Sequence, residues 1–173
     1  MKIAPAKLIR IANETDAHHI AAIHVASWQK IYRGHIPDAV LNNLSIDEKA
    51  ERWLGLLKNN NRILVIELDG LMVGFASIGS SRDTDVDCAK YGEIYALYLH
   101  PDYWRQHLGT LLCNKAFSDL KEMGFTEVTV WVLKENLLAR KFYEKIGFIE
   151  TGDEKADDFD NVILDEVRYQ KKL

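Results

Sequence analysis

Residues 95–112, reading YALYLHPDYWRQHLGTLL, have the residue types and spacing of an anion-binding turn. A strand-like run ends at the His-Pro pair, and a helical pattern starts near Leu108. The first N–H groups of a helix lack partners within it, and the helix dipole is positive there. Arg105 adds a cation, and Gly109 lets the backbone approach a ligand. The turn is predicted to bind a phosphate or pyrophosphate, although a plain connection with an exposed arginine would have the same pattern.

A second segment, residues 136–148, reads NLLARKFYEKIGF and predicts a short amphipathic helix. Asn136 is a typical N-cap, and Gly147 stands where a helix C-terminus favours a left-handed residue. Tyr143 lies on this helix and is expected to be a buried tyrosine that finds a hydrogen-bond partner. The apolar residues expected in the core are Leu137, Phe142 and Ile146.

Other strands and helices must position these two segments. The sequence patterns predict elements in the order β-α-α-β-β-β-α-β-α-β-β. Asp69-Gly70 between two β-branched runs is a strong hairpin signal, whereas the acidic residues 152–160 are expected to form a turn. A central mixed sheet with helices on both faces, of the α/β class and α+β type, accommodates this order. The 173 residues predict a single domain, 1–173. The expected strands are Leu8–Ala12, Ile63–Leu68, Leu71–Ile78, Glu93–Leu99, Val128–Leu133, Phe148–Thr151 and Val162–Tyr169.

Together the two segments, EIYALYLHPDYWRQHLGTLL and VWVLKENLLARKFYEKIGF, resemble the cofactor-binding core of the GNAT superfamily of acyl-CoA-dependent N-acyltransferases. The resemblance covers about residues 7–169 and includes the order of elements. It implies a twisted, mostly antiparallel sheet that splays between its fourth and fifth strands. It also implies an acetyl-CoA-dependent N-acetyltransferase with acetyl-CoA as cosubstrate and no metal.

The resemblance assigns cofactor contacts residue by residue. Pantetheine would pair with backbone groups of the fourth strand, and the pyrophosphate would lie on the amides of the following turn. The residues so implied are Leu97, Tyr98, Leu99, Arg105, Gln106, His107, Leu108, Gly109, Thr110, Asn136 and Tyr143. The turn departs from the family pattern, because Trp104 and His107 replace the usual Gln or Arg and the usual first glycine. His107 therefore has to adopt a backbone angle that glycine adopts more readily.

The implied reaction is direct attack of an amine on the acetyl thioester. An alkylammonium with a pKa near 10 must first lose a proton to a base, which can act through water. Tyr143 matches the family's usual proton donor to the thiolate, and Glu93 is the predicted base. A salt-bridged, non-catalytic Glu93 is the open alternative.

The acceptor site is harder to locate from the sequence. Trp28 and Tyr32 share a helical face and would line an acceptor pocket, unless they form part of the core. Two acidic segments, residues 80–90 and 152–160, would attract a cationic acceptor if they flank the pocket; otherwise they are a solvated surface. The acceptor is expected to be a small-molecule or peptide amine.

The composition limits which partners, cellular compartment and metal sites are expected. A net charge of -4 argues against a nucleic-acid partner. No signal peptide or membrane-spanning run is recognised, so a cytoplasmic protein without a membrane partner is expected. Cys88 and Cys113 are expected to be reduced thiols, and the six histidines suggest no metal site. A non-catalytic acyl-CoA sensor of the same fold remains the competing function, and a homodimer is possible by analogy.

Overall fold

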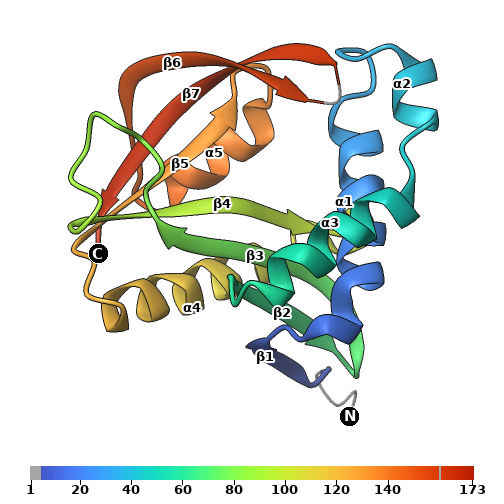
Figure 1. The fold of residues 1–173 in the computed structure, drawn as a ribbon, viewed down its shortest axis with the longest axis horizontal. Helices are drawn as coiled ribbons and strands as arrows, with labels where there is room; N and C mark the ends of the chain where they lie inside the picture. Colours follow the sequence, from blue (N-terminus) through green and yellow to red (C-terminus); the bar gives the residue numbers. More distant parts are fainter. Residues whose placement is uncertain (1–4, 160) are drawn as a thin grey trace. The chain divides into compact units, whose positions relative to one another are not determined.

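The computed structural model describes residues 5–159 and 161–173, which form two compact units. The N-terminal unit comprises the chain up to Ile78 together with Ala96–Ala116, and the C-terminal unit comprises Gly79–Tyr95 and Phe117–Leu173. The elements (Figure 1) are β1 (Lys7–Ile11), η1 (Glu14–Asp16), α1 (Ala17–Ile31), α2 (Asp38–Asn42), α3 (Ile46–Lys58), β2 (Arg62–Leu68), β3 (Leu71–Ser80), β4 (Tyr91–Leu99), η2 (Pro101–Tyr103), α4 (Leu108–Glu122), β5 (Glu127–Leu133), α5 (Leu137–Lys145), β6 (Ile149–Phe159) and β7 (Val162–Lys172). The single-domain organisation stays a prediction.

The strands form a seven-stranded sheet in the order β1-β2-β3-β4-β5-β7-β6. The β1–β2, β2–β3, β5–β7 and β6–β7 pairs are antiparallel, and β4–β5 is parallel. The predicted mixed, mostly antiparallel sheet is therefore confirmed. The Asp69-Gly70 turn is the expected tight hairpin turn, since both residues have positive φ (49° and 83°).

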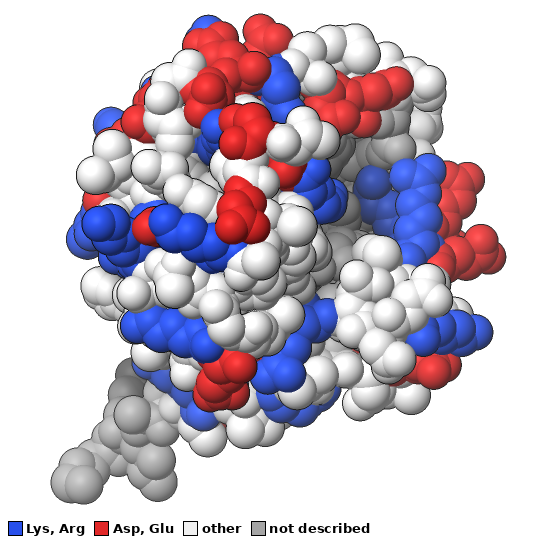
Figure 2. All heavy atoms as spheres, turned by 60° about the vertical axis from the view of Figure 1, so that its left-hand side comes forward, with Lys and Arg blue, Asp and Glu red and all other residues white. Residues whose placement is uncertain are grey.

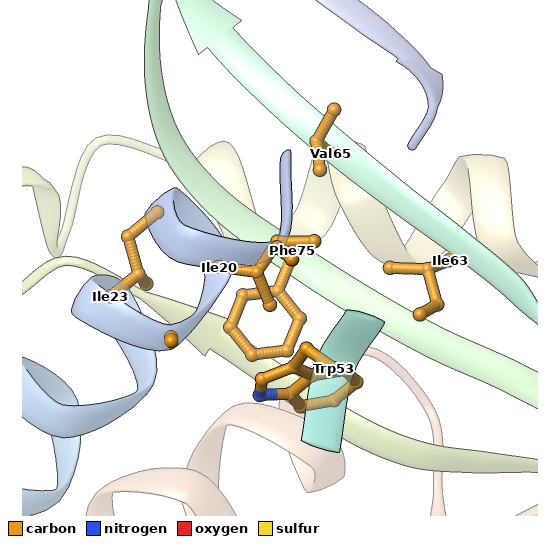
Figure 3. Close-up of a cluster of buried hydrophobic side chains, with 8 residues drawn as sticks. Ile20, Ile23, Trp53, Ile63, Val65 and Phe75 are labelled. Carbon is orange, nitrogen blue, oxygen red and sulfur yellow. The ribbon is translucent and has the colours of Figure 1, made fainter. Parts of the chain in front are cut away.

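The core of the N-terminal unit lies between its helices and its strands. Helices α1 and α3 pack against β2 and β3 through apolar side chains of all four elements (Figure 3). The indole of Trp53 meets the ring of Phe75 edge-on, with their centroids 5.0 Å apart. This packing fixes α1 against the strands and buries its apolar stripe.

The parallel ladder between β4 and β5 is short. It joins Tyr91–Ile94 to Glu127–Val130, whereas β4 runs on to Leu99 and β5 to Leu133. This is the predicted splay between the fourth and fifth strands.

The register of the C-terminal unit separates two faces of its strands. Paired residues point to the same face, so Glu93, Thr129 and Gln170 share one face, as do Trp131 and Arg168. The opposite face is apolar and buried, and its members include Ile94, Val128, Val130, Val132, Val167 and Tyr169. The end of α4 covers this face. A Cβ atom added to Gly92 would lie 2.8 Å from Leu120 Cδ2, and the rings of Phe117 and Phe148 are in contact with their centroids 5.9 Å apart.

Two local expectations were wrong. The acidic segment beginning at Gly152 is not a turn: after a register shift between Glu150 and Glu154, residues 154–159 pair with β7 as strand. Its side chains are mostly exposed, so the sequence lacks the alternation that marks a half-buried strand. Asp160 lies outside the described residues. Leu137 is not in the core either; it is 59% exposed in the first turn of α5.

Candidate functional site

The turn that leads from β4 into α4 has an unusual backbone. Arg105 and His107 both have φ of 61°, in the left-handed region that non-glycine residues seldom adopt. The helical hydrogen bond donated by Leu111 N–H to the His107 carbonyl measures 3.2 Å. By helix geometry, the N–H groups of Leu108, Gly109 and Thr110 precede that bond and have no intrahelical acceptor. The turn thus presents amides and a positive dipole end beside Arg105.

Two side chains to which the sequence analysis assigned no role support this turn. Trp104 donates from its indole Nε1 to the Leu99 carbonyl at 2.8 Å, and the Ser27 hydroxyl donates to the same oxygen at 2.7 Å. A carbonyl oxygen has two lone pairs, so Leu99 accepts its full complement inside the protein. Any hydrogen bond from pantetheine therefore has to use other backbone groups of residues 97–99. The departure of Trp104 from the family pattern was the available signal.

Close backbone packing holds the end of β4 in place. A Cβ atom added to Gly74 would lie 2.9 Å from the Tyr98 carbonyl oxygen, so the glycine permits this approach of β3 to β4. The His100 N–H donates to the Val73 carbonyl at 2.8 Å and continues that contact.

Helix α5 carries the other two predicted cofactor residues. The side-chain oxygen of Asn136 caps the helix by accepting from the Ala139 N–H at 3.1 Å, which leaves the amide NH2 as the part able to donate to a ligand. Tyr143 is 5% exposed, with its ring edge-on to Phe142 and Phe148 at centroid distances of 5.2 and 5.3 Å.

A hydrogen-bond network centred on a buried tyrosine links α5 to β6 and β7. Tyr169, fully buried on β7, donates to Glu144 at 2.9 Å and accepts from Arg140 Nε at 3.1 Å. Arg140 also donates to Glu150 at 2.8 Å and to the Lys134 carbonyl at 3.1 Å. These contacts raise the pKa of Arg140, chiefly through its hydrogen bond with Tyr169.

Glu93, the predicted base, is buried and ion-paired. Its Oε2 accepts from the Arg82 backbone N–H at 2.9 Å, and its Oε1 lies 2.6 Å from Arg82 Nη2. The Arg82 guanidinium also lies over the ring of Tyr95, 4.4 Å from its centroid. The salt-bridged alternative for Glu93 thus describes its state in this structure, and its role as a base stays a prediction.

Arg168 pairs with much of the acidic charge that the sequence suggested would attract a cation. Its guanidinium contacts Asp83 at 3.1 Å, and Asp85 and Asp153 at 2.6 Å each. These bonds lower the pKa of Asp85, mainly through Arg168, and raise that of Arg168. Figure 2 shows Asp and Glu side chains gathered at the level of the β6–β7 hairpin with basic side chains among them, so this surface is of mixed charge.

Trp28 and Tyr32, predicted to line an acceptor pocket, are buried in the N-terminal unit at 5% and 6% exposure. Their rings pack edge-on at 5.0 Å, and the Trp28 indole donates to the Tyr98 hydroxyl at 3.1 Å. His24, stacked on Tyr98 at 4.8 Å, belongs to the same aromatic cluster. This packing favours the core alternative, and their acceptor role stays a prediction.

Two other kinds of chemistry can be judged from the described residues. Among them, no group of three or more His, Cys, Asp or Glu side chains could hold a metal ion. Burial raises the pKa of Cys113 to about 12, which disfavours a thiolate nucleophile there.

None of the helices in the described ranges is long and apolar enough to cross a membrane.

Comparison with known proteins gives a consistent family assignment. The model of the acetyltransferase (GNAT) family matches residues 25–148. YuaI of Bacillus subtilis, an uncharacterized N-acetyltransferase, is 33% identical over 129 residues, which cover 74% of this chain and 72% of YuaI.

Solved structures share the fold at lower identity. PaiA N-acetyltransferase of Thermoplasma acidophilum, in complex with coenzyme A, has a TM-score of 0.71 at 22% identity, covering 97% of this chain and 99% of that one. The acetyltransferase YncA of Salmonella typhimurium, with acetyl-CoA, has a TM-score of 0.70 at 20% identity, covering 96% and 94%. The chain therefore belongs to the acetyltransferase (GNAT) family, which confirms the N-acetyltransferase class predicted from its sequence.

Proposed function

We propose that this chain transfers an acetyl group from acetyl-CoA to a primary amine by direct attack of the amine on the thioester. The observation that carries the proposal is the turn before α4, where two left-handed residues lead into a helix N-terminus beside Arg105. Structures of the same fold that hold coenzyme A or acetyl-CoA support the choice of donor.

The residues of the turn fit the chemistry of a pyrophosphate. Residues Arg105–Thr110 offer backbone N–H donors, a cation and the positive end of a 15-residue helix, and Gly109 adds no side chain to obstruct a ligand. The NH2 group of Asn136 would donate to the pantetheine arm, along with backbone groups of Leu97 and Tyr98. When bound, acetyl-CoA supplies a thioester that the amine can attack.

Side chains of the protein would carry out the proton transfers. A phenol with a pKa near 10 is protonated at neutral pH, so the Tyr143 hydroxyl can give its proton to the departing thiolate. A base has to take a proton from the acceptor's ammonium group, and the sequence predicts Glu93 for this task.

The acceptor is proposed to be a small amine or a peptide amine. Because Arg168 pairs with Asp83, Asp85 and Asp153, these acids offer less attraction to a polycation such as a polyamine than their number suggests. A homodimer stays a prediction, which light scattering would check.

The test is calorimetric titration of the protein with acetyl-CoA, followed by a panel of amines with detection of free coenzyme A. Binding, with coenzyme A released by one class of amine, is expected. Gly109→Val should weaken binding by obstructing the pyrophosphate; unchanged affinity would show that the site is misplaced. Binding without release by any amine would favour the non-catalytic sensor, and no binding would contradict the proposal.

A further inference from the structure

The C-terminal unit has a polar face that the assigned cofactor residues do not use. The register places Glu93 of β4, Trp131 of β5 and Arg168 of β7 on one face of the strands. Glu166 lies two residues from Arg168 on the same face, and Lys155 of β6 is its partner in register. Buried charged side chains cost free energy unless they are paired, and clusters of them occur preferentially at functional sites.

This polar face is centred where β4 and β5 separate. Their ladder ends at Ile94 and Val130, so Tyr95 and Trp131 are the first residues past the last paired row. The Trp131 indole donates to Asp83, with distances of 3.0 and 3.2 Å to its two oxygens. Lys155 Nζ lies 4.5 Å and the Arg168 guanidinium 5.4 Å from the Trp131 ring centroid. Trp131 is therefore surrounded by polar groups of the C-terminal unit that are themselves held by contacts.

Two buried carboxylates, Glu93 and Glu166, lie on this face, and their surroundings differ. Both oxygens of Glu93 accept hydrogen bonds from Arg82: Oε2 from the backbone N–H, and Oε1 from Nη2 at 2.6 Å and Nε at 3.3 Å. Both oxygens of Glu93 are therefore occupied by donors of Arg82, and an acceptor's ammonium group would have to compete with that arginine for them.

Glu166 is held less firmly. It is 8% exposed, and its ion pair with Lys155 Nζ is long, at 3.4 Å. Desolvation raises the pKa of Glu166, and the charge of Asp157 on β6 adds to this effect. The charges of Lys155 and Arg82 lower the pKa of Glu166, but the net shift is upward. Leu133, its partner in register on β5, is apolar. Glu166 is therefore a buried carboxylate with one long ion pair and a raised pKa, which suits it to accept a proton.

We propose that Glu166 binds the ammonium group of the acceptor on this polar face and takes its proton, in place of Glu93. This inference rests on the proposed acetyl transfer. One proton passes from the ammonium nitrogen to Glu166, and the free amine then forms the C–N bond as the C–S bond breaks. The second proton lost by the nitrogen restores the phenol of Tyr143, which has given its own proton to the thiolate, and Glu166 releases its proton to solvent.

The experiment compares Glu166→Gln with Glu93→Gln, using Glu154→Gln as the matched control. Glu154 is an exposed glutamate on the same hairpin, paired with Lys134 at 2.8 Å. Glu166→Gln should lower kcat/KM for the amine about 100-fold, the lower range for loss of a general base. It should also abolish the acid limb of the pH profile, whereas acetyl-CoA affinity by calorimetry stays unchanged. Glu154→Gln should match the wild type.

A second readout uses the protein without substrate. Because the folded-state pKa of Glu166 is raised, its ionisation destabilises the fold as pH rises through that pKa. The Tm of Glu166→Gln should therefore exceed that of the wild type at neutral pH, and the difference should disappear in acid. Glu166→Asp, which keeps a carboxylate, should retain the acid limb with a reduced rate and thus separates loss of chemistry from loss of fold.

The outcomes distinguish the two proposals. An active wild type whose acid limb is lost in Glu93→Gln and kept in Glu166→Gln would overturn the role of Glu166 and leave acetyl transfer intact. A wild type that binds acetyl-CoA but acetylates no amine would remove the proposed function and this inference with it.

Discussion

The guanidinium of Arg82 holds the carboxylate of Glu93, with Nη2 2.6 Å from Oε1, and thereby ties residues 81–90 to the start of β4. Glu93 is 1% exposed at its side chain, whereas Arg82 is 63% exposed. The pair thus consists of a buried anion covered by a cation at the surface, and the energetic consequences of breaking it depend on which partner is removed.

Removing Arg82 should cost more stability than removing Glu93. Arg82→Gln leaves a buried carboxylate without its cation, and we expect the free energy of unfolding to fall by about 3 kcal/mol. Glu93→Gln leaves an arginine that water can solvate, so its cost should be smaller. Urea unfolding of both single variants and the double variant gives the coupling. A double variant whose loss equals the sum of the single losses would show that the pair contributes nothing.

The left-handed backbone at His107 makes a second prediction. His107→Val puts a β-branched residue at a φ of 61° and should destabilise the protein by about 2 kcal/mol, weakening acetyl-CoA binding as the turn rearranges. His107→Gly removes the strain and should keep or tighten that binding. Thermal unfolding and calorimetry measure the two effects. Equal behaviour of the Val and Gly variants would contradict a role for this backbone conformation.

A third prediction concerns pH and the ion pair of Arg10 with Asp16 in the N-terminal unit. The guanidinium donates twice to the carboxylate, at 2.7 and 2.9 Å, and this contact is the main cause of the lowered pKa of Asp16. A depressed folded-state pKa stabilises the fold above the ordinary aspartate pKa, and this contribution is lost as pH falls through the folded value. Asp16→Asn should therefore lose about 3 kcal/mol at pH 7, and this loss should shrink as pH falls from the ordinary pKa of 3.8 through the lowered folded-state pKa.

Urea unfolding at pH 7 and across a series of acidic pH values below 3.8 checks this prediction. Asp47→Asn is the control, because Asp47 is 90% exposed at its side chain and lies 3.4 Å from an exposed histidine, so it should change little at any of these pH values. A loss from Asp16→Asn that is equally large in acid would show that packing, and not the charge of Asp16, is responsible.

The sequence predicted the parts of the fold that have local signals. The Asp69-Gly70 turn, the cap at Asn136 and the helix before Met123 each depend on residues close in sequence, and the structure has all three. The strand after Gly152 was missed because its exposed side chains carry no alternation and its stability comes from pairing with β7.

The candidate site also combines features that have local sequence signals with features that depend on residues far apart in the sequence. The anion-binding turn could be located because helix ends and glycine have local signatures. The pairing of Arg82 with Glu93 and of Arg168 with Asp83 could not be predicted, because these partners are 11 and 85 residues apart and the loop that carries Arg82 and Asp83 meets the strands only in the folded chain. The same reason hides Glu166, whose neighbours Lys155 and Leu133 come from two other strands.

The fourth prediction compares two buried tyrosines of the C-terminal unit. Tyr143→Phe should lower kcat at least 10-fold, since the thiolate loses its proton donor, while acetyl-CoA affinity and stability change little. Tyr169→Phe is the matched control: it removes the hydroxyl that contacts Glu144, Glu150 and Arg140 and should cost about 2 kcal/mol of stability.

Steady-state kinetics, calorimetry with acetyl-CoA and thermal unfolding of both variants separate the two roles. Tyr169→Phe should reduce kcat less than Tyr143→Phe despite its larger loss of stability, because its hydroxyl orients α5 and does not meet the thiolate. A Tyr143→Phe enzyme with the turnover of the wild type would remove the proton-donor assignment. An equal loss of kcat in both variants would instead indicate that α5 has moved, since displacement of the helix changes the position of Tyr143 whichever hydroxyl is removed.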